Sequence, residues 1–265
     1  MKHRNSLSFI TAILLVGLVA CTSSGKKDQE AAKAETTEKM AVADNTLSEQ
    51  EKEEGWMLLF DGETTEGWRG YNMEAFPDTG WTIEDGTIKC SESGRGEAGF
   101  GGDIIYDKKF TNFHLKLDWM ISDGGNSGIF FLAQEVPGKK IWYTAPEYQI
   151  LDNCSDHVDN MLGEDGNRRA GSLYDLIPPD PQNARCAGEW NHSEVISYEG
   201  TIVFRMNGEN TMEFHLWTDE WNQMIADSKY PEFNPGFADV AKTGYIGLQD
   251  HGHNVWFKNI KLKEL

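Results

Sequence analysis

Apolar residues at every second position of one nine-residue segment constrain the fold of this chain more than any other feature. Between residues 113 and 121 the odd-numbered residues are Phe, Leu, Leu, Trp and Ile, and the even-numbered ones are His, Lys, Asp and Met. Since neighbouring side chains of a β-strand point to opposite faces, this period of two predicts a strand with one face on a core. The chain is therefore expected to fold around a β-sheet.

Short turn dipeptides between further strand-like segments predict two hairpins. Asp85-Gly86 separates residues 81–83 from 87–89, and Asn207-Gly208 separates residues 202–206 from 211–216. Such pairs favour the tight turns that join antiparallel strands. Residues 244–249 and 254–262 predict two more strands, whereas only residues 219–228 show a helical pattern, with Asp219 as N-cap. We expect an all-β fold, an antiparallel two-sheet jelly-roll sandwich with one short helix.

The first 54 residues are not expected to join the core. Residues 1–20 begin with cationic side chains, continue with a short apolar run and end with small residues, the pattern of a secretory signal peptide. The segment Leu18-Val19-Ala20-Cys21 resembles a bacterial lipoprotein box, which predicts lipidation of Cys21; an ordinary signal peptide is the alternative. Residues 22–54 contain no aromatic residue and are rich in Lys, Glu, Ala, Thr and Ser, which predicts a flexible charged tether.

Three segments follow from these patterns. Residues 1–20 are expected to be a lipoprotein signal peptide, residues 21–54 the lipidated cysteine and its tether, and residues 55–265 a single jelly-roll catalytic domain. The apolar run is too short to span a bilayer, so the lipid alone would hold the protein to a membrane. We expect a location in the bacterial cell envelope, either periplasmic or on the surface.

Charge and cysteine spacing exclude two classes of function. The chain has 24 Lys and Arg against 43 Asp and Glu, a formal net charge of −19, which repels the phosphates of nucleic acids. The four cysteines, Cys21, Cys90, Cys154 and Cys186, show no zinc-ligand spacing. A disulfide between Cys154 and Cys186 and buried free thiols both remain open.

The densest polar cluster on a strand pattern is residues 146–153. Period-2 alternation places Glu147 and Gln149 on one face and Tyr148 on the other. A bulge near residues 150–151 would bring Asp152 onto the face of Glu147. Two carboxylates flanking a sugar are the usual apparatus of glycoside cleavage, which makes this pair a candidate. Loop capping by Glu147 and Asp152 is the alternative.

Two further clusters carry imidazoles. Asp250 and His251 lie between two predicted strands, and a His beside a carboxylate is a candidate base; a metal site or a plain turn are the alternatives. His157 lies in residues 153–190, a long segment with little periodicity that we interpret as a binding loop or lid. Aromatic residues near this segment are candidates for stacking on sugar rings, with core packing as the alternative: Trp142, Tyr143, Tyr174 and Trp190.

These segments, together with further motifs along the chain, resemble the 3-keto-disaccharide hydrolase family. The resemblance runs in order through most of residues 55–265, and its motifs include residues 55–62, 67–72, 81–86, 101–105, 124–130, 144–153, 170–175, 188–191 and 247–252. Two positions depart from the family pattern: His192-Ser193-Glu194 follows Glu-Trp-Asn, and Phe204-Arg205 precedes the Asn-Gly turn. The resemblance implies a concanavalin-like jelly roll that acts on glycosides oxidised to a ketone at C3.

A C3 ketone acidifies the proton on C2, so the resemblance implies removal of that proton and β-elimination of the aglycone, with or without later addition of water. The catalytic candidates are Glu147, Asp152, His157 and His251. Arg69, Tyr174 and a divalent metal ion are candidates for stabilising the enolate. The residues expected to bind the carbohydrate substrate are Arg69, Asn126, Trp142, Gln149, Tyr174, Trp190 and Asp250.

Two other functions remain open. One is an ordinary glycoside hydrolase that uses Glu147 and Asp152, and the other is a non-catalytic carbohydrate-binding lipoprotein. For a 3-keto-glycoside substrate, we expect an upstream glycoside 3-oxidase or dehydrogenase as the metabolic partner that supplies it. No cofactor is certain from the sequence.

Overall fold

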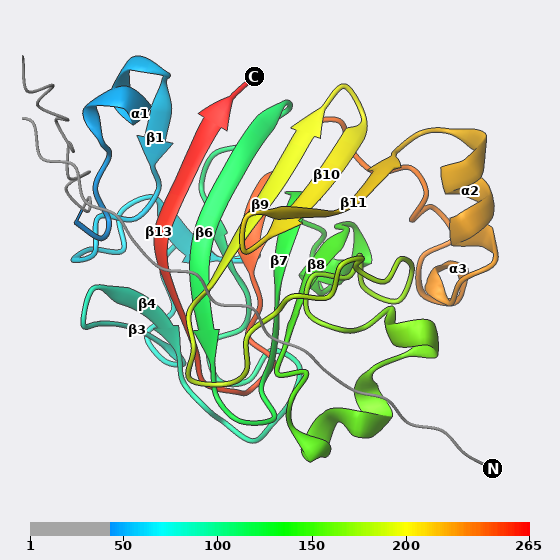
Figure 1. Cartoon of the computed structure of the whole chain (residues 1–265), viewed down its shortest axis with the longest axis horizontal. Coiled ribbons are helices and arrows are strands. Elements are labelled where there is room, and N and C mark those ends of the chain that lie inside the picture. The colour runs from blue at the N-terminus through cyan, green and yellow to red at the C-terminus, as the bar shows by residue number, and fades with distance from the viewer. Residues whose placement is uncertain (1–42) are drawn as a thin grey trace, which may run out of the picture. The chain divides into compact units, whose positions relative to one another are not determined.

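Two antiparallel sheets make up the fold (Figure 1). The computed structural model describes residues 43–265. The larger sheet contains, in spatial order, β11 (Glu209–His215), β10 (Thr201–Met206), β9 (Asn191–Tyr198), β6 (Phe113–Ile121), β13 (Val255–Glu264), β4 (Thr87–Cys90) and β3 (Trp81–Glu84), and β1 (Trp56–Leu58) also pairs with β13. The smaller sheet contains β2 (Trp68–Gly70), β5 (Ile104–Tyr106), β12 (Tyr245–Leu248), β7 (Asn126–Ala133) and β8 (Glu147–Leu151). The predicted all-β two-sheet sandwich is confirmed.

The helices are short and lie outside the sheets. They are α1 (Glu49–Glu53), α2 (Asp219–Ala226) and α3 (Tyr230–Phe233), with 3-10 turns at Ile141–Tyr143, Asp156–Met161 and Glu164–Gly166. The predicted helix is α2, but its N-cap is Thr218, whose side chain accepts a hydrogen bond from the amide of Trp221 at 3.1 Å. The prediction of a single helix missed α1 and α3, which are too short for a periodic pattern. No helix within residues 43–265 is long and apolar enough to cross a membrane.

The alternation that predicted the sheet is present in β6. Its odd-numbered residues are buried and its even-numbered ones are partly exposed. Both predicted hairpins form: β3 pairs with β4, and β10 with β11. Asp85 and Gly86 have φ angles of 48° and 72°, the left-handed conformation that two-residue hairpin turns require and that Asp-Gly tolerates.

The main core lies between the two sheets. Buried side chains from the larger sheet include Leu115, Trp119 and Phe257, and those from the smaller sheet include Tyr148 and Ile150. In Figure 1, β13, β6 and β9 lie in front of β7 and β8. All eight residues of β7 are buried because a second apolar cluster covers part of its outer face: Ile105, Phe130, Ala133, Ile141 and Ala145.

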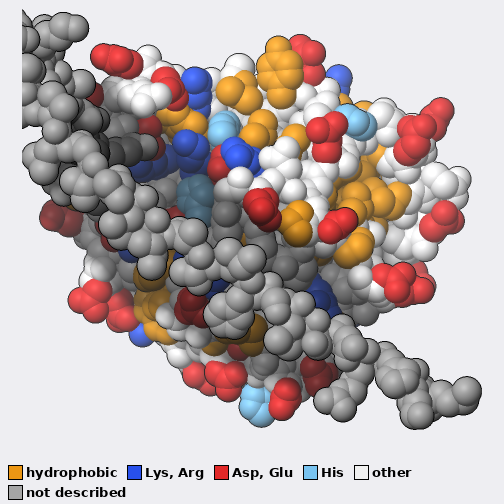
Figure 2. All heavy atoms as spheres, viewed as in Figure 1, with side chains coloured by type: hydrophobic (Ala, Val, Ile, Leu, Met, Phe, Trp, Pro, Cys, Tyr) orange, Lys and Arg blue, Asp and Glu red, His pale blue; other side chains and the backbone are white. Residues whose placement is uncertain are grey.

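The outer face of the larger sheet is polar. Lys, Arg and His side chains gather over its central strands, with acidic side chains around them (Figure 2). His192 Nδ1 lies 2.6 Å from Asp118 and His114 Nε2 lies 2.5 Å from Glu194. Burial alone would lower the pKa of His192, but hydrogen bonds to Asp118 and Glu194 outweigh it and raise the pKa to about 9. The charged side chains of this face are therefore paired with one another.

Residues 43–54 belong to the folded domain, which corrects the predicted tether. Asn45 is buried, and its side chain donates to the carbonyl of Gly86 at 2.8 Å and accepts from the amide of Asn259 at 2.8 Å. Glu51 in α1 pairs with Lys261 on β13 at 2.8 Å. The segment docks through polar side chains. The absence of aromatic residues, on which the prediction of a tether was based, therefore does not report on this docking. The predictions for the signal peptide, Cys21 and the rest of the tether lie outside the described residues.

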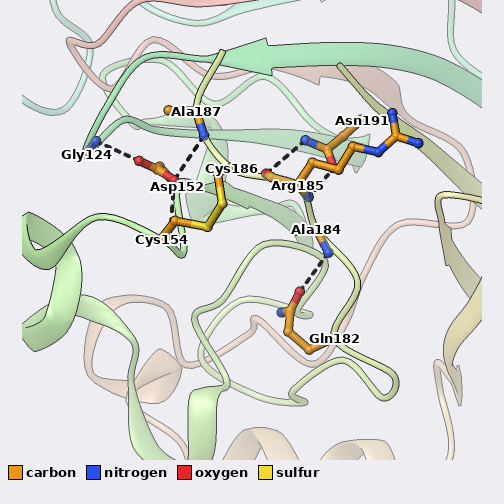
Figure 3. The surroundings of a disulfide bond; sticks show 9 residues. All are labelled: Gly124, Asp152, Cys154, Gln182, Ala184, Arg185, Cys186, Ala187 and Asn191. Atoms are coloured by element: carbon orange, nitrogen blue, oxygen red, sulfur yellow. Dashed lines mark hydrogen bonds between the residues drawn. A yellow bond between two sulfur atoms is a disulfide. The ribbon is translucent and has the colours of Figure 1, made fainter. Parts of the chain in front are cut away.

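A disulfide joins Cys154 to Cys186, with 5.5 Å between their Cα atoms (Figure 3). This settles the open question of the thiols, while Cys90 is a buried free cysteine. The bond ties the loop after β8 to the segment before β9. The long segment between them also contacts β8 directly: the amide of Gln149 donates to Ser172, and the amide of Tyr174 donates to Glu147. The segment therefore covers the free edge of β8 and carries Tyr174 to the outer face of the smaller sheet.

Candidate active site

A cavity of about 200 Å³ opens on the outer face of the smaller sheet. Its floor comes from three neighbouring strands: Asn126 begins β7, Glu147 and Gln149 lie on β8, and Gln249 follows β12. Tyr148, between the two β8 residues, points into the core. The alternation predicted for residues 147–149 is therefore confirmed, and it places a carboxyl and an amide side by side in the cavity.

The side chain of Glu147 is buried and has no hydrogen-bond partner among the described residues. It lies against Gly128 on β7, where an added Cβ atom would come within 2.3 Å of Glu147 Oε1. Any larger residue at position 128 would displace the carboxyl. Burial, together with the nearby charges of Glu97 and Asp103, raises the pKa of Glu147 well above its usual value. The carboxyl group therefore holds its proton more tightly than an exposed glutamate does, which suits a group that donates a proton.

Two carboxamides offer free acceptors beside Glu147. Gln149 Oε1 and Gln249 Oε1 are buried without a partner, while Gln149 Nε2 lies 3.4 Å from Asn126 Oδ1. Buried acceptors without a donor are costly in the free protein and are satisfied when a ligand supplies hydroxyl groups. A floor with several free acceptors suits a polyol such as a sugar.

Aromatic rings form the walls. Trp142 meets Phe233 of α3 edge-on across 5.8 Å, and Tyr230 donates its hydroxyl to the carbonyl of Tyr174 at 3.0 Å. Burial raises the pKa of Tyr174 to about 12, and the charge of Glu147 adds to this. Flat rings of this kind pack against the C–H faces of sugars, so the walls fit the same ligand as the floor.

His251 and Lys229 complete the lining. His251 Nε2 lies 3.6 Å from Glu97 Oε1, and its Nδ1 is buried without a partner. Lys229 lies just before α3, 4.4 Å above the ring of Tyr174 and 3.2 Å from Asp175. It is the one cationic side chain in the lining of this cavity. The cavity thus brings together a buried carboxyl group with a raised pKa, an imidazole with a free nitrogen and an ammonium group.

Six residues singled out in the sequence meet in this cavity: Asn126, Trp142, Glu147, Gln149, Tyr174 and His251. The predicted convergence of residues 147–149 with His251 is thus present in the fold. Sequence reasoning missed Glu97, Lys229, Tyr230, Phe233 and Gln249. Gln249 stood in the same motif as Asp250, whereas Lys229 and Phe233 follow the predicted helix and gave no periodic signal.

Asp152 does not share the face of Glu147, and the predicted bulge is wrong. β7 and β8 pair without a register shift from Phe130 and Glu147 to Asn126 and Leu151. The Asp152 carboxylate accepts backbone N–H bonds from Gly124, Cys154 and Ala187 at 3.1–3.2 Å (Figure 3). It anchors the loops around the disulfide, as the loop-capping alternative proposed, and the two-carboxylate apparatus is not assembled.

Asp250 also lies outside the cavity. Its carboxylate is fully buried and accepts N–H bonds from Gly101, Gly102 and Gly252. These contacts fix the loop that carries His251. No three His, Cys, Asp or Glu side chains of residues 43–265 lie close enough together to share a metal ion.

The other three candidates lie elsewhere on the surface. His157 has 80% of its side chain exposed and lies 4.0 Å from Asp123. Arg69 on β2 forms a bidentate ion pair with Glu135, with N–O distances of 2.6 and 2.8 Å. Its guanidinium group is therefore already bound within the protein. Trp190 packs under Lys258 at 4.4 Å, on the outer face of the larger sheet. The family departures at His192, Glu194 and Arg205 lie on that face too, away from the lining of the cavity.

A family model described as the 3-keto-alpha-glucoside-1,2-lyase-like domain matches residues 55–263. The chain belongs to this family. A protein of Bacteroides thetaiotaomicron named 3-keto-disaccharide hydrolase is 42% identical to it, and the alignment covers 97% of each chain. Membership of the 3-keto-alpha-glucoside-1,2-lyase-like family makes the protein an enzyme that acts on glycosidic bonds, which confirms the resemblance seen in the sequence.

Solved structures agree with the family. A protein of Parabacteroides distasonis, named as a candidate glycosyl hydrolase, superposes with a TM-score of 0.73 at 33% identity, covering 84% of this chain and 100% of the other. A second such protein from the same species gives a TM-score of 0.61 at 26% identity, covering 79% and 99%. This member of the 3-keto-alpha-glucoside-1,2-lyase-like family therefore shares its overall fold with both solved structures.

Proposed function

We propose that the protein cleaves the glycosidic bond of 3-keto-glycosides by removing the C2 proton and eliminating the aglycone. The observation that carries this proposal is the set of three groups in one sugar-sized cavity: the buried carboxyl of Glu147, the imidazole of His251 and the ammonium group of Lys229. Proton removal beside a ketone needs a base, a positive charge near the enolate oxygen and an acid for the leaving oxygen. The family and the name of the Bacteroides relative support the same substrate class.

His251 is the proposed base. Its free nitrogen accepts the proton from C2, and the electrons of that bond form a C2–C3 double bond while negative charge moves to the ketone oxygen. Glu97, 3.6 Å from the other nitrogen, stabilises the imidazolium that forms. Lys229 faces the charge that develops on the enolate oxygen, the role that an ammonium group fills best in a water-poor site.

Glu147 is the proposed acid. As the enolate collapses, a C1–C2 double bond forms, the C1–O bond breaks, and the departing oxygen takes the proton of Glu147. The products are an unsaturated 3-keto sugar and the free aglycone. Addition of water across the new double bond gives the 3-keto sugar, so the net reaction is hydrolysis even though the first step is a lyase reaction. Gln149, Gln249 and Asn126 bind the ring hydroxyls.

A direct comparison of substrates tests this proposal. The purified protein is incubated with a 3-keto-glucoside and with its unoxidised parent, and release of the aglycone is followed. We expect turnover of the ketone only. Equal cleavage of both compounds, or of the parent alone, would contradict the proposal, and retention on a glycan without any turnover would favour a binding module.

We further propose that the protein acts in the bacterial cell envelope, anchored through a lipid on Cys21. The lipoprotein-like segment that ends at Cys21 supports this proposal. An enzyme that oxidises glycosides at C3 must supply the substrate, because the reaction has no oxidation step of its own. Cys21→Ser should move the protein from the membrane fraction to the soluble fraction with unchanged specific activity, and an unchanged membrane fraction would exclude the anchor.

A further inference from the structure

Two aromatic rings form an exposed corner at the mouth of the catalytic cavity. Trp142 and Phe233 both line this cavity, and their rings meet edge-on with centroids 5.8 Å apart and planes at 79° to each other. Phe233 has 51% of its surface exposed, whereas Glu147 and Gln149 on the floor have only 5% and 2%. The cavity is therefore polar at its buried end and apolar where it opens to solvent.

Hydrogen bonds on both sides hold the two rings in place. The indole nitrogen of Trp142 donates to Glu97 at 3.0 Å, which fixes the orientation of that ring. Asn234, directly after α3, donates through Nδ2 to the carbonyl of Tyr143 at 2.7 Å. This bond ties the helix that carries Phe233 to the 3-10 turn that carries Trp142. The corner is formed before a ligand arrives, and preorganisation of this kind lowers the entropy cost of binding.

The polar groups beside the corner already have partners. The carboxylate of Glu97 accepts the bond from Trp142 and lies 3.6 Å from His251, and the ammonium group of Lys229 lies 3.2 Å from Asp175. The carboxamide oxygens without a partner belong to the buried floor of the cavity. A group rich in hydroxyls would therefore lose water at the corner without gaining matching hydrogen bonds, whereas an apolar ring would lose none.

The size of the cavity places the leaving group at this corner. Pockets for drug-sized ligands enclose roughly 300–1,000 Å³, whereas the catalytic cavity encloses about 200 Å³. A sugar ring bound to the polar floor occupies this space, so the group attached at C1 extends through the mouth. There it meets the rings of Trp142 and Phe233.

We propose that the corner formed by Trp142 and Phe233 binds the leaving group of the substrate, and that the preferred leaving group carries an apolar ring, as in an aryl or benzyl 3-keto-glycoside. This inference rests on the proposed function, since it assigns the part of that substrate that departs. A flat ring in the corner packs against the face of one side chain and the edge of the other, both of which are favoured arrangements of aromatic rings. Phe233 is thus a specificity-determining residue.

The test compares benzyl 3-keto-glucoside with methyl 3-keto-glucoside of the same anomeric configuration. Benzyl alcohol and methanol have similar acidity, so the ratio of the two kcat/KM values reports contacts with the ring and not the ease of departure. The wild-type protein should favour the benzyl compound by about tenfold or more, because the ring leaves water on binding. Phe233→Ala should lower the ratio by about threefold to tenfold, the effect of losing one aromatic contact. Phe233→Tyr keeps the ring and should retain the ratio.

Tyr198→Ala is the matched control, because Tyr198 is 50% exposed, lies on β9 of the larger sheet and does not line the cavity. A wild-type ratio near one, or a ratio that Phe233→Ala leaves unchanged, would overturn the aromatic site. An equal loss of kcat/KM on a 3-keto-disaccharide in Phe233→Ala would assign the corner to a second sugar and overturn the preference for an apolar ring. Failure of the wild-type protein to cleave any 3-keto substrate would instead overturn the proposed function.

Discussion

Glu97 and His251 face each other across 3.6 Å, which joins the loop before β5 to the loop after β12. Each residue comes from a loop at the rim of the smaller sheet, and each is held by other contacts: Glu97 accepts a bond from Trp142, and Asp250, next to His251, accepts three backbone N–H bonds. The imidazole is therefore held in the wall of the cavity that Glu147 also lines, although it does not lie on a strand.

Glu147→Gln should lower kcat/KM by about 10²-fold or more on a 3-keto-glucoside, because the amide keeps the shape of the side chain but is too weak an acid to protonate the leaving oxygen. Steady-state kinetics at pH 7 measures the effect. Glu220→Gln, on the exposed side of α2, is the matched control and should retain wild-type activity. A loss of less than threefold at position 147 would remove Glu147 from the acid role.

The same substitution should change how stability depends on pH. Burial raises the pKa of Glu147 in the folded protein above its unfolded value of 4.5, so the folded state holds a proton that the unfolded state has lost. Stability due to this group is therefore full below pH 4.5 and decreases as pH rises toward the folded pKa. Thermal unfolding should show Glu147→Gln melting increasingly above the wild-type protein as pH rises from 4.5. A constant difference at every pH would contradict the raised pKa.

Lys229→Met should lower kcat by about 10²–10³-fold, the range for loss of one charge-stabilising group in a transition state. Lys229→Arg, which keeps the positive charge, should recover part of this loss. Lys242→Met serves as control, because Lys242 is exposed and does not line the cavity. If Lys229→Met raises KM alone and leaves kcat unchanged, the ammonium group binds the substrate without stabilising the enolate.

The start of the folded domain can be tested by truncation. A soluble form that begins at residue 43 should melt at the same temperature as one that begins at residue 22. A form that begins at residue 55 loses the Asn45 contacts and the Glu51–Lys261 pair. Its melting temperature should fall by several degrees, at about 2–4 °C for each kcal/mol lost in a domain of this size. Equal melting of all three forms would show that α1 adds no stability.

Local patterns predicted much of the fold. The alternation in β6 and the Asp85-Gly86 and Asn207-Gly208 turns predicted strands and hairpins correctly, because each depends on the spacing of neighbouring residues. The docking of residues 43–54 was missed, since it depends on one buried Asn whose partners lie 41 and 214 positions away. Polar contacts between residues so far apart produce no periodic pattern in the sequence.

The candidate site was predicted in part for the same reason. Glu147 and Gln149 followed from alternation on one strand, and His251 from its position at a strand end. Asp152 was placed wrongly, because the backbone amides of Gly124 and Ala187, 28 and 35 positions away, bind its carboxylate together with the nearby amide of Cys154. Lys229 and Phe233 enter the cavity only because α2 and α3 fold beside it, and this packing could not be deduced from residues 219–234 alone.

In the proposed reaction, the first chemical step removes the C2 proton. The most direct measurement is NMR of the reaction in deuterated water, with a 3-keto-glucoside as substrate and with Glu147→Gln and boiled protein as controls. We expect an early product with a C1–C2 double bond, followed by a 3-keto sugar that carries deuterium at C2. A 3-keto sugar formed at the full rate with its original C2 proton, and without any unsaturated product, would contradict it.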